Sequence, residues 1–306
     1  MPRYLITTGS SKTGAATIVA LKNLGVSAAD IVAGSRDPAR SEAQLKALGA
    51  GHVIAFDHED EAVIEKALVG IDAVLVSVGA TLRIAPVYSR VERIASKSGS
   101  SVKSIVGIGA VLNGRDDAAL ASAGDVAKDF AAAHKAITSS KLDSAIVAPN
   151  WFFENWKLPS TWAQLQAGTV YGSSADGKVA YIAAQDIGNV AAVVLTNTHK
   201  YNGQVLEITG PQALTEGEAA AIVAKIALGK ADGAQYVSVP EADFRQALTD
   251  AGLPAGWVDY LYELETIKAA GFASAVTTLV KDVTGRDPVS AEAWAKQLAA
   301  ELASAK

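Results

Sequence analysis

The sequence predicts an α/β protein built on a doubly wound parallel sheet. Short apolar runs recur through the first half of the chain, and helical patterns such as residues 61–68 lie between them. The apolar residues of each run are consecutive rather than alternating, which is typical of strands buried on both faces. Repeated strand–helix–strand units of this length place helices on both faces of a parallel sheet. The expected strands are 5–8, 30–33, 52–56, 73–78, 104–108 and 144–148.

The composition narrows the class of protein. The chain has 306 residues, of which 50% are hydrophobic, and a net charge of −5, so it can bury a large core without disulfides or metal. The absence of cysteine excludes disulfides and thiolate chemistry but leaves the compartment open. No apolar run approaches the roughly 20 residues that cross a bilayer, no leader pattern precedes the first strand, and no Lys/Arg block marks a nucleic-acid surface. We expect a cytoplasmic monomer or homodimer that binds small molecules and neither nucleic acid nor membrane.

The character of the chain changes after Pro149. An aromatic stretch at 150–156 is followed by a Gly/Ser-rich stretch, and most of the remaining sequence has helical patterns. We expect residues 1–150 to form the sheet domain and residues 151–306 a smaller, mainly helical lid over the ligand edge of the sheet. Two strand candidates in this second part could rejoin the main sheet. They are 179–182 and 204–208.

A glycine turn follows the first expected strand. Gly9 and Gly14 enclose Ser10, Ser11, Lys12 and Thr13, and a helical pattern begins directly afterwards. Such a turn lets the backbone approach a pyrophosphate, which the free amides and the positive end of the helix dipole stabilise. The spacing is one residue shorter than the three-glycine dinucleotide pattern and lacks its middle glycine. This stretch alone is compatible with a phosphate cradle and with a tight turn that binds nothing.

The end of the second expected strand bears on the type of dinucleotide. In folds that prefer NAD, an Asp or Glu about 20 residues beyond the glycine loop hydrogen-bonds the ribose hydroxyls. Here that position falls on Gly34-Ser35-Arg36, where a hydroxyl and a guanidinium can receive a 2′-phosphate, with Lys12 as a further cation. The residues predict NADP(H) rather than NAD(H). The alternative is that Arg36 is a solvated loop residue.

Six segments occur in an order that points to one family. They are LITTG (5–9), KTG (12–14), GSRDP (34–38), GIDAV (70–74), KLD (141–143) and APNWFFEN (148–155). In this order they resemble the NmrA-like atypical short-chain dehydrogenase/reductases, and the resemblance covers most of the chain. That family implies a Rossmann fold with a bound dinucleotide. It includes NADPH-dependent quinone and triphenylmethane reductases, and also cofactor-sensing regulators without turnover.

The resemblance implies a place for each part of the cofactor. The pyrophosphate would lie at Gly9 to Gly14 and the 2′-phosphate near Arg36, while Asp57 would lie near the adenine. These positions fit the rule that ligands lie at the carboxyl ends of parallel strands. The cofactor ribose would be lined by Ser77, Val78 and Gly79. The nicotinamide and the substrate would be bordered by Pro149, Asn150, Trp151 and Phe152.

The Ser-Tyr-Lys set of ordinary short-chain dehydrogenases is absent. The serine position corresponds to Gly109, and no tyrosine occurs between Tyr88 and Tyr171. His134 is the one group of near-neutral pKa expected near the nicotinamide, so we predict it as a proton donor. The alternative is a helix residue that hydrogen-bonds a loop. No metal site is expected, since the remaining histidines lack metal-ligand spacing.

The aromatic stretch suggests the kind of acceptor. Trp151 and Phe152 can stack on a flat substrate or can pack a hinge between sheet and lid. A quinoid acceptor takes a hydride from the cofactor and a proton from water, so the missing tyrosine would be tolerated. We expect an NADPH-dependent reductase of a bulky, flat carbonyl, quinone or imine-like compound that acts by positioning and desolvation. The alternatives are a non-catalytic NADP(H)-responsive binding protein and an isomerase or lyase with a structural dinucleotide.

Overall fold

The computed structural model describes residues 1–79, 81–113 and 124–304, and the chain divides into two compact units. The chain passes between the units several times, whereas the sequence-based expectation has a single boundary near residue 150. Unit 1 comprises Met1–Pro149, Ala184–Glu207 and Leu279–Arg286. Unit 2 comprises Asn150–Ala183, Ile208–Thr278 and Asp287–Lys306.

Unit 1 is built on a seven-stranded sheet with the strand order β3-β2-β1-β4-β5-β6-β9. Neighbouring strands from β3 to β6 are parallel, so the doubly wound parallel sheet is confirmed. The chain order reverses between β1 and β4, and open α/β sheets bind ligands outside the carboxyl ends of the strands at such a reversal. The strands are β1 (Tyr4–Ile6), β2 (Ile31–Ser35), β3 (His52–Ala55), β4 (Ala73–Val76), β5 (Ser104–Ile108), β6 (Asp143–Pro149) and β9 (Gln204–Ile208).

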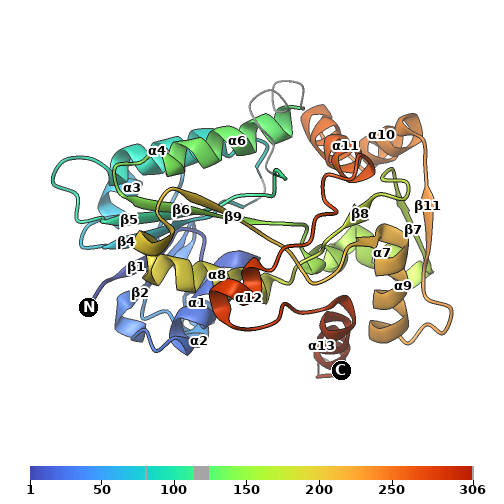
Figure 1. The fold of residues 1–306 in the computed structure, drawn as a ribbon, viewed down its shortest axis with the longest axis horizontal. Helices are drawn as coiled ribbons and strands as arrows, with labels where there is room; N and C mark the ends of the chain where they lie inside the picture. The colour runs from blue at the N-terminus through green and yellow to red at the C-terminus, as the bar shows by residue number, and fades with distance from the viewer. Residues whose placement is uncertain (80, 114–123, 305–306) are drawn as a thin grey trace. The chain divides into compact units, whose positions relative to one another are not determined.

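Helices cover both faces of this sheet (Figure 1). One face carries α3, α4 and α6, where Val91 and Ile137 join strand residues such as Val74 in one buried apolar cluster. The other face carries α1, α2, α8 and α12. Coverage on both sides is the reason that the strand residues are consecutively apolar. The helices are α1 (Lys12–Asn23), α2 (Pro38–Leu48), α3 (Glu61–Ala67), α4 (Ala85–Ala95), α6 (Asp125–Thr138), α8 (Ala184–Thr196) and α12 (Leu279–Thr284), with 3-10 turns η1 (Ala28–Asp30) and η3 (Thr198–Tyr201).

The place of α8 in unit 1 depends on a close contact between helices. α1 and α8 pack together, and a Cβ at Gly188 would lie 2.4 Å from the carbonyl carbon of Ala16, so only glycine permits this approach. Ile187, Val190 and Val194 of α8 are fully buried. A helix with so wide an apolar surface has to be covered on most sides, which places it with the sheet rather than with the residues that precede it.

The two strand candidates after residue 150 lie in different sheets. The candidate at 204–208 is β9, which lies beside β6 in the seven-stranded sheet. The candidate at 179–182 is shorter in the structure, where β8 (Lys178–Val179) pairs antiparallel with β10 (Leu214–Thr215) in a sheet of its own. Ile182 instead forms an isolated parallel bridge with Phe152, and this change of partner ends the regular pairing.

Unit 2 is mainly helical, as expected. Its core contains an aromatic cluster in which Phe153 stacks on both Tyr181 and Trp294, with centroids 5.6 and 5.5 Å apart. Phe153 and Trp156 are buried in this core, so they pack the unit. The elements are η2 (Phe153–Lys157), α7 (Pro159–Ala167), β7 (Thr169–Gly172), β8, β10, α9 (Glu216–Ala227), β11 (Gln235–Ser238), α10 (Glu241–Asp250), α11 (Ala255–Ala269) and α13 (Ala291–Ser304).

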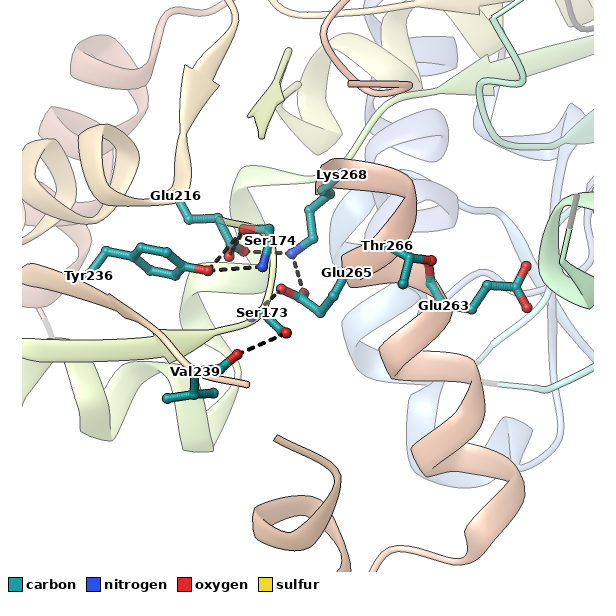
Figure 2. A network of polar contacts seen from close by, with 9 residues as sticks. All are labelled: Ser173, Ser174, Glu216, Tyr236, Val239, Glu263, Glu265, Thr266 and Lys268. Atoms are coloured by element: carbon teal, nitrogen blue, oxygen red, sulfur yellow. Dashed lines mark hydrogen bonds and ion pairs between the residues drawn. The ribbon is translucent and has the colours of Figure 1, made fainter. Parts of the chain in front are cut away.

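A buried ion cluster connects four parts of unit 2 (Figure 2). Lys268 of α11 lies 2.6 Å from a carboxylate oxygen of Glu216 at the start of α9, and it also pairs with Glu265. Ser174, which follows β7, donates its hydroxyl to Glu216 at 2.7 Å and its N–H to the hydroxyl of Tyr236 in β11 at 3.0 Å. The cluster therefore holds α9, α11, β11 and the segment after β7 in one arrangement.

Among the described residues, no helix has the length and apolar character needed to span a membrane.

Candidate functional site

A cavity of about 560 Å³ lies in unit 1 at the carboxyl ends of four neighbouring strands. Each of β1 to β4 contributes residues that follow its last position, so the cavity lies where the chain order of the sheet reverses. This is the place that the topology assigns to a ligand. Its lining includes Thr7, Thr8 and Ser10 after β1, Ser35 at the end of β2 with Arg36 and Arg40 after it, Phe56, Asp57 and His58 after β3, and Val78, Gly79 and Thr81 after β4.

The glycine turn between β1 and α1 is held by its own hydrogen bonds. Ser11 caps α1, since its hydroxyl oxygen accepts the N–H of Gly14 at 3.0 Å and its hydroxyl donates to the carbonyl of Thr8 at 2.8 Å. A Cβ at Gly14 would lie 2.0 Å from the same carbonyl oxygen, so this position requires glycine. The N–H of Gly9 donates to the carbonyl of Gly34 at 2.9 Å, which joins the turn to the end of β2. Of the six predicted turn residues, Ser10 lines the cavity, and the others build the turn and the first turn of α1.

The end of β2 places two guanidinium groups at the cavity. Arg36, predicted to lie near the 2′-phosphate, lines it, and Arg40 in the first turn of α2 lines it too. Asp37 also lies there, but one of its carboxylate oxygens accepts the backbone N–H of Arg40 at 3.1 Å and caps α2. The Ser35 oxygen accepts from the Ser41 hydroxyl at 2.8 Å and from the N–H of Asp37 at 3.1 Å. The sequence reasoning missed Arg40, whose spacing of four residues from Arg36 was the available signal.

The residues after β4 contain a buried hydroxyl that lacks a partner. Ser77 exchanges backbone hydrogen bonds with the hydroxyl of Thr7, at 3.1 Å through its N–H and 3.0 Å through its carbonyl. Its own Oγ is buried and has no hydrogen-bond partner within residues 1–79, 81–113 and 124–304. Buried polar groups are normally paired. Ser77, predicted at the cofactor ribose, is buried behind the wall of the cavity, whereas Val78 and Gly79 line it.

Two residues that follow β3 also line the cavity. Asp57, predicted to lie near the adenine, lines the cavity, and its Oδ1 accepts the N–H of Glu59 at 3.0 Å. His58 beside it was not predicted as a site residue. Its Nε2 lies 3.3 Å from Thr7 Oγ1, and its ring meets Phe56 edge-on with centroids 5.0 Å apart. The signal that would have found His58 is its position directly after a predicted strand and a predicted site residue.

His134 of α6 lies beside Gly109, the residue at the missing serine position. A Cβ at Gly109 would lie 2.1 Å from His134 Nε2, so the imidazole fills the space of a side chain there. Nε2 accepts the N–H of Ala110 at 3.4 Å, which ties the helix to the residue after β5. Burial lowers the pKa of His134 to about 4, so the ring is neutral at pH 7. A neutral ring whose Nε2 accepts a backbone N–H supports the loop-bonding alternative, and the proton-donor role stays a prediction.

The residues expected at the nicotinamide lie on either side of the boundary between the units. Pro149 ends β6 in unit 1, and its carbonyl accepts the N–H of Val111 at 3.2 Å. Asn150 begins unit 2 and is buried, with its amide donating to the carbonyl of Ala273 at 2.9 Å and its Oδ1 accepting the N–H of Trp151 at 2.8 Å. Trp151 and Phe152 are half-buried. The Asn150 side chain is thus committed to the backbone, whereas the two rings keep accessible surface.

Comparison with known proteins identifies the family of this chain. The profile of a family described as NAD(P)H-binding matches residues 9–198, which include the ends of β2, β3 and β4 at the cavity. The chain belongs to this NAD(P)H-binding family. The predicted NmrA-like resemblance and the nicotinamide dinucleotide as cofactor are thereby confirmed. No group of three or more potential metal ligands occurs in the part of the chain that the structure describes.

Several named relatives of this NAD(P)H-binding protein are oxidoreductases. It is 31% identical to quinone oxidoreductase 2 of Escherichia coli over 249 residues, which cover 80% of this chain and 81% of the relative. It is 33% identical to the NAD(P)H azoreductase of Xenophilus azovorans over 171 residues, 55% of this chain and 57% of that one. The chain spans about half the length of other curated relatives that it matches.

Solved structures share the fold over almost the whole chain. The crystal structure of the NADPH-dependent quinone oxidoreductase of Escherichia coli in complex with NADPH superposes with a TM-score of 0.81 at 27% identity. The superposition covers 96% of this chain and 99% of that one. The Rossmann-type fold is therefore confirmed for the NAD(P)H-binding protein.

Proposed function

We propose that this protein is an NADPH-dependent reductase that delivers hydride to a bulky, flat acceptor of the quinone, carbonyl or imine-like type. The observation that carries the proposal is the pair of guanidinium groups, Arg36 and Arg40, that lines the cavity at the end of β2. Planar guanidinium groups bind phosphate oxygens with two hydrogen bonds each, and a carboxylate at position 36 would instead repel a 2′-phosphate. In this proposal the pyrophosphate lies at the turn from Gly9 to Gly14 and the adenine near Asp57.

The substrate side is assigned to the start of unit 2. Pro149 borders the nicotinamide in this proposal, and the partly exposed Trp151 and Phe152 stack on a flat acceptor. Asn150 acts indirectly, because its side chain fixes the backbone at residues 151 and 273. Residues 151–306 then supply the substrate region, and residues 1–150 supply most of the cofactor site.

The chemistry divides between cofactor and protein. Bound NADPH supplies the hydride. The protein holds the cofactor through Arg36, Arg40 and the turn after β1, orients the acceptor, and keeps water from the transfer. His134 is neutral at pH 7, so solvent is the proton source in this proposal. Quinones suit such a site because their reduced form takes its proton from water, and the names of the quinone and azo reductases among the relatives support this acceptor class.

A second candidate is a non-catalytic NADP(H)-responsive regulator, which the buried, neutral state of His134 favours. Turnover separates the two. Protein carrying stoichiometric NADPH is mixed with a benzoquinone, an azo dye and an aromatic ketone, and the loss of the NADPH absorbance band is followed, with NADH in parallel. The reductase predicts rapid oxidation by the quinone or dye. If the protein binds NADPH tightly but none of the three acceptors supports its oxidation, the protein is a regulator.

We also propose a cytoplasmic location and a monomeric or homodimeric state.

A further inference from the structure

The hydrogen bonds around Thr7 fix which ring nitrogen of neutral His58 carries the proton. The Thr7 hydroxyl donates its single hydrogen to the carbonyl of Ser77 at 3.0 Å and accepts the N–H of Ser77 at 3.1 Å. The Thr7 Oγ1 oxygen can then only accept a further hydrogen bond, so His58 Nε2, 3.3 Å away, has to be the donor. Neutral His58 is therefore the Nε2–H tautomer. Protonation at Nδ1 adds a charge without breaking this contact.

The charged groups around His58 come from three places. Asp57 and Glu59 flank it in its own segment, and both raise its pKa. Arg90 of α4 donates to the His58 carbonyl at 2.5 Å and pairs with Glu59 at 3.0 Å. Arg36, from the end of β2, lines the same cavity and lowers the pKa of His58. Burial is the largest cause and lowers the pKa of His58, and it outweighs the next largest, a hydrogen bond with the Ser77 backbone that raises the pKa. The net result is a pKa below the ordinary value, so the ring is neutral at pH 7.

We propose that His58 is a specificity-determining residue of the dinucleotide site, whose protonation is coupled to the 2′-phosphate bound at Arg36. The inference rests on the proposed NADPH preference. A 2′-phosphate beside Arg36 offsets the guanidinium charge in the cavity that His58 also lines, and it adds negative charge to that cavity. Protonated His58 is then favoured in the NADPH complex over the free protein. NADH lacks the phosphate and leaves the imidazole neutral.

The direction of the pH effect follows from this linkage. The pKa of His58 is higher in the NADPH complex than in the free protein, so binding takes up a proton and affinity rises as pH falls through the range between the two values. The selectivity for NADPH over NADH should therefore be larger at pH 6 than at pH 8, by roughly threefold. The 2′-phosphate itself titrates near pH 6. A variant that lacks the imidazole is therefore needed to separate the contribution of His58 from that of the phosphate.

Calorimetric titration tests the proposal without any turnover. NADPH and NADH are titrated into wild-type protein and His58→Gln at pH 6, 7 and 8, in buffers of different ionisation enthalpy, so that protons taken up per cofactor are counted. Wild type should take up more protons with NADPH at pH 6 than His58→Gln, and its selectivity should rise more steeply on acidification. His52→Gln changes an exposed histidine at the opposite end of β3 and should behave as wild type. Identical proton counts and identical pH dependence in wild type and His58→Gln would overturn the inference.

A measurement on the free protein separates this inference from the cofactor assignment. The His58 ring is titrated by NMR in wild type and in Arg36→Ala, and the pKa should rise in the variant because the positive charge of Arg36, which lowers the pKa of His58, is gone. An unchanged pKa contradicts the coupling. If wild type instead binds NADPH and NADH equally at every pH, the proposed NADPH preference fails, whatever the NMR titration shows.

Discussion

The imidazole of His134 occupies the space beside Gly109 that a side chain at residue 109 would need. A Cβ there would lie 2.1 Å from Nε2 and 2.9 Å from Cγ2 of Ile146, and Nε2 accepts the N–H of Ala110. The glycine at the serine position and the histidine in the next helix are therefore two parts of one packing arrangement. This arrangement explains why serine is excluded at residue 109.

Substitution of Gly109 by serine should destabilise the fold. The new side chain has to displace the His134 ring, and overpacking of a buried site costs about 1 to 3 kcal/mol. Urea unfolding of Gly109→Ser measures the loss, and the double variant Gly109→Ser/His134→Ala should recover part of it. A single variant as stable as wild type would show that the imidazole moves aside freely.

The buried imidazole also predicts a pH dependence of stability. The pKa of His134 is about 4 in the folded protein and about 6.5 in the unfolded chain, so the unfolded state binds more protons between these values. Its contribution to stability is present above pH 6.5 and is lost as pH falls toward 4. The loss between pH 7 and pH 5 should be about 2 kcal/mol.

His134→Asn isolates this contribution in urea unfolding at the two pH values. The variant is less stable at pH 7, because its smaller side chain leaves a gap, but it should lose about 2 kcal/mol less than wild type on acidification. Equal losses in both proteins would mean that the ring is solvated and titrates normally.

Substitution of Asp129 should destabilise the fold more than substitution of Arg83, which is paired with it. Its carboxylate accepts the N–H of Ile84 at 2.6 Å and of Ala85 at 3.4 Å, and it pairs with Arg83 at 3.0 Å. The Arg83 side chain is 72% exposed, so Arg83→Ala should cost at most about 1 kcal/mol. Asp129→Ala leaves buried donors unpaired and should cost about 1 to 3 kcal/mol.

The same pair of variants has a binding readout. The segment that Asp129 holds follows Gly79 and Thr81, which line the cavity. Asp129→Ala should therefore weaken NADPH binding, whereas Arg83→Ala should leave it near the wild-type value. If the two substitutions had equal effects on unfolding and on NADPH binding, the larger role assigned to Asp129 would be wrong.

The ion cluster of unit 2 predicts a variant whose loss of stability relative to wild type becomes smaller as pH falls (Figure 2). Burial lowers the pKa of Lys268, but the carboxylates of Glu216 and Glu265 outweigh it and the net pKa is raised. Lys268→Met leaves two buried carboxylates without a cation, which should cost about 3 to 5 kcal/mol at pH 7. Their pKa values are then raised, so the deficit should shrink as pH falls from 7 to 5. Thermal unfolding at both values measures this, with Lys225→Met of α9 as the control, and a constant deficit would contradict the account.

The sequence predicts the strands and the glycine turn because both depend on local patterns. Consecutive apolar residues indicate strands covered on both faces, and the turn needs Gly14 next to the Thr8 carbonyl within six residues of chain. Contacts between distant segments leave no such pattern. His58 next to Thr7 and the cluster around Lys268 depend on strand order and helix packing, which spacing does not encode. The early end of β8 likewise depends on the bridge between Phe152 and Ile182.

The central claim is that Arg36 makes the cavity an NADPH site. Fluorescence titration of NADPH and NADH into wild type and Arg36→Ala tests it most directly, with Arg93→Ala as a control at an exposed arginine of α4. Loss of charge-assisted hydrogen bonds of about 1.5 to 3 kcal/mol should weaken NADPH binding roughly tenfold to a hundredfold in Arg36→Ala. NADH affinity should barely change, and the control should match wild type for both cofactors. Equal weakening of NADPH and NADH, or no weakening of either, would contradict the claim.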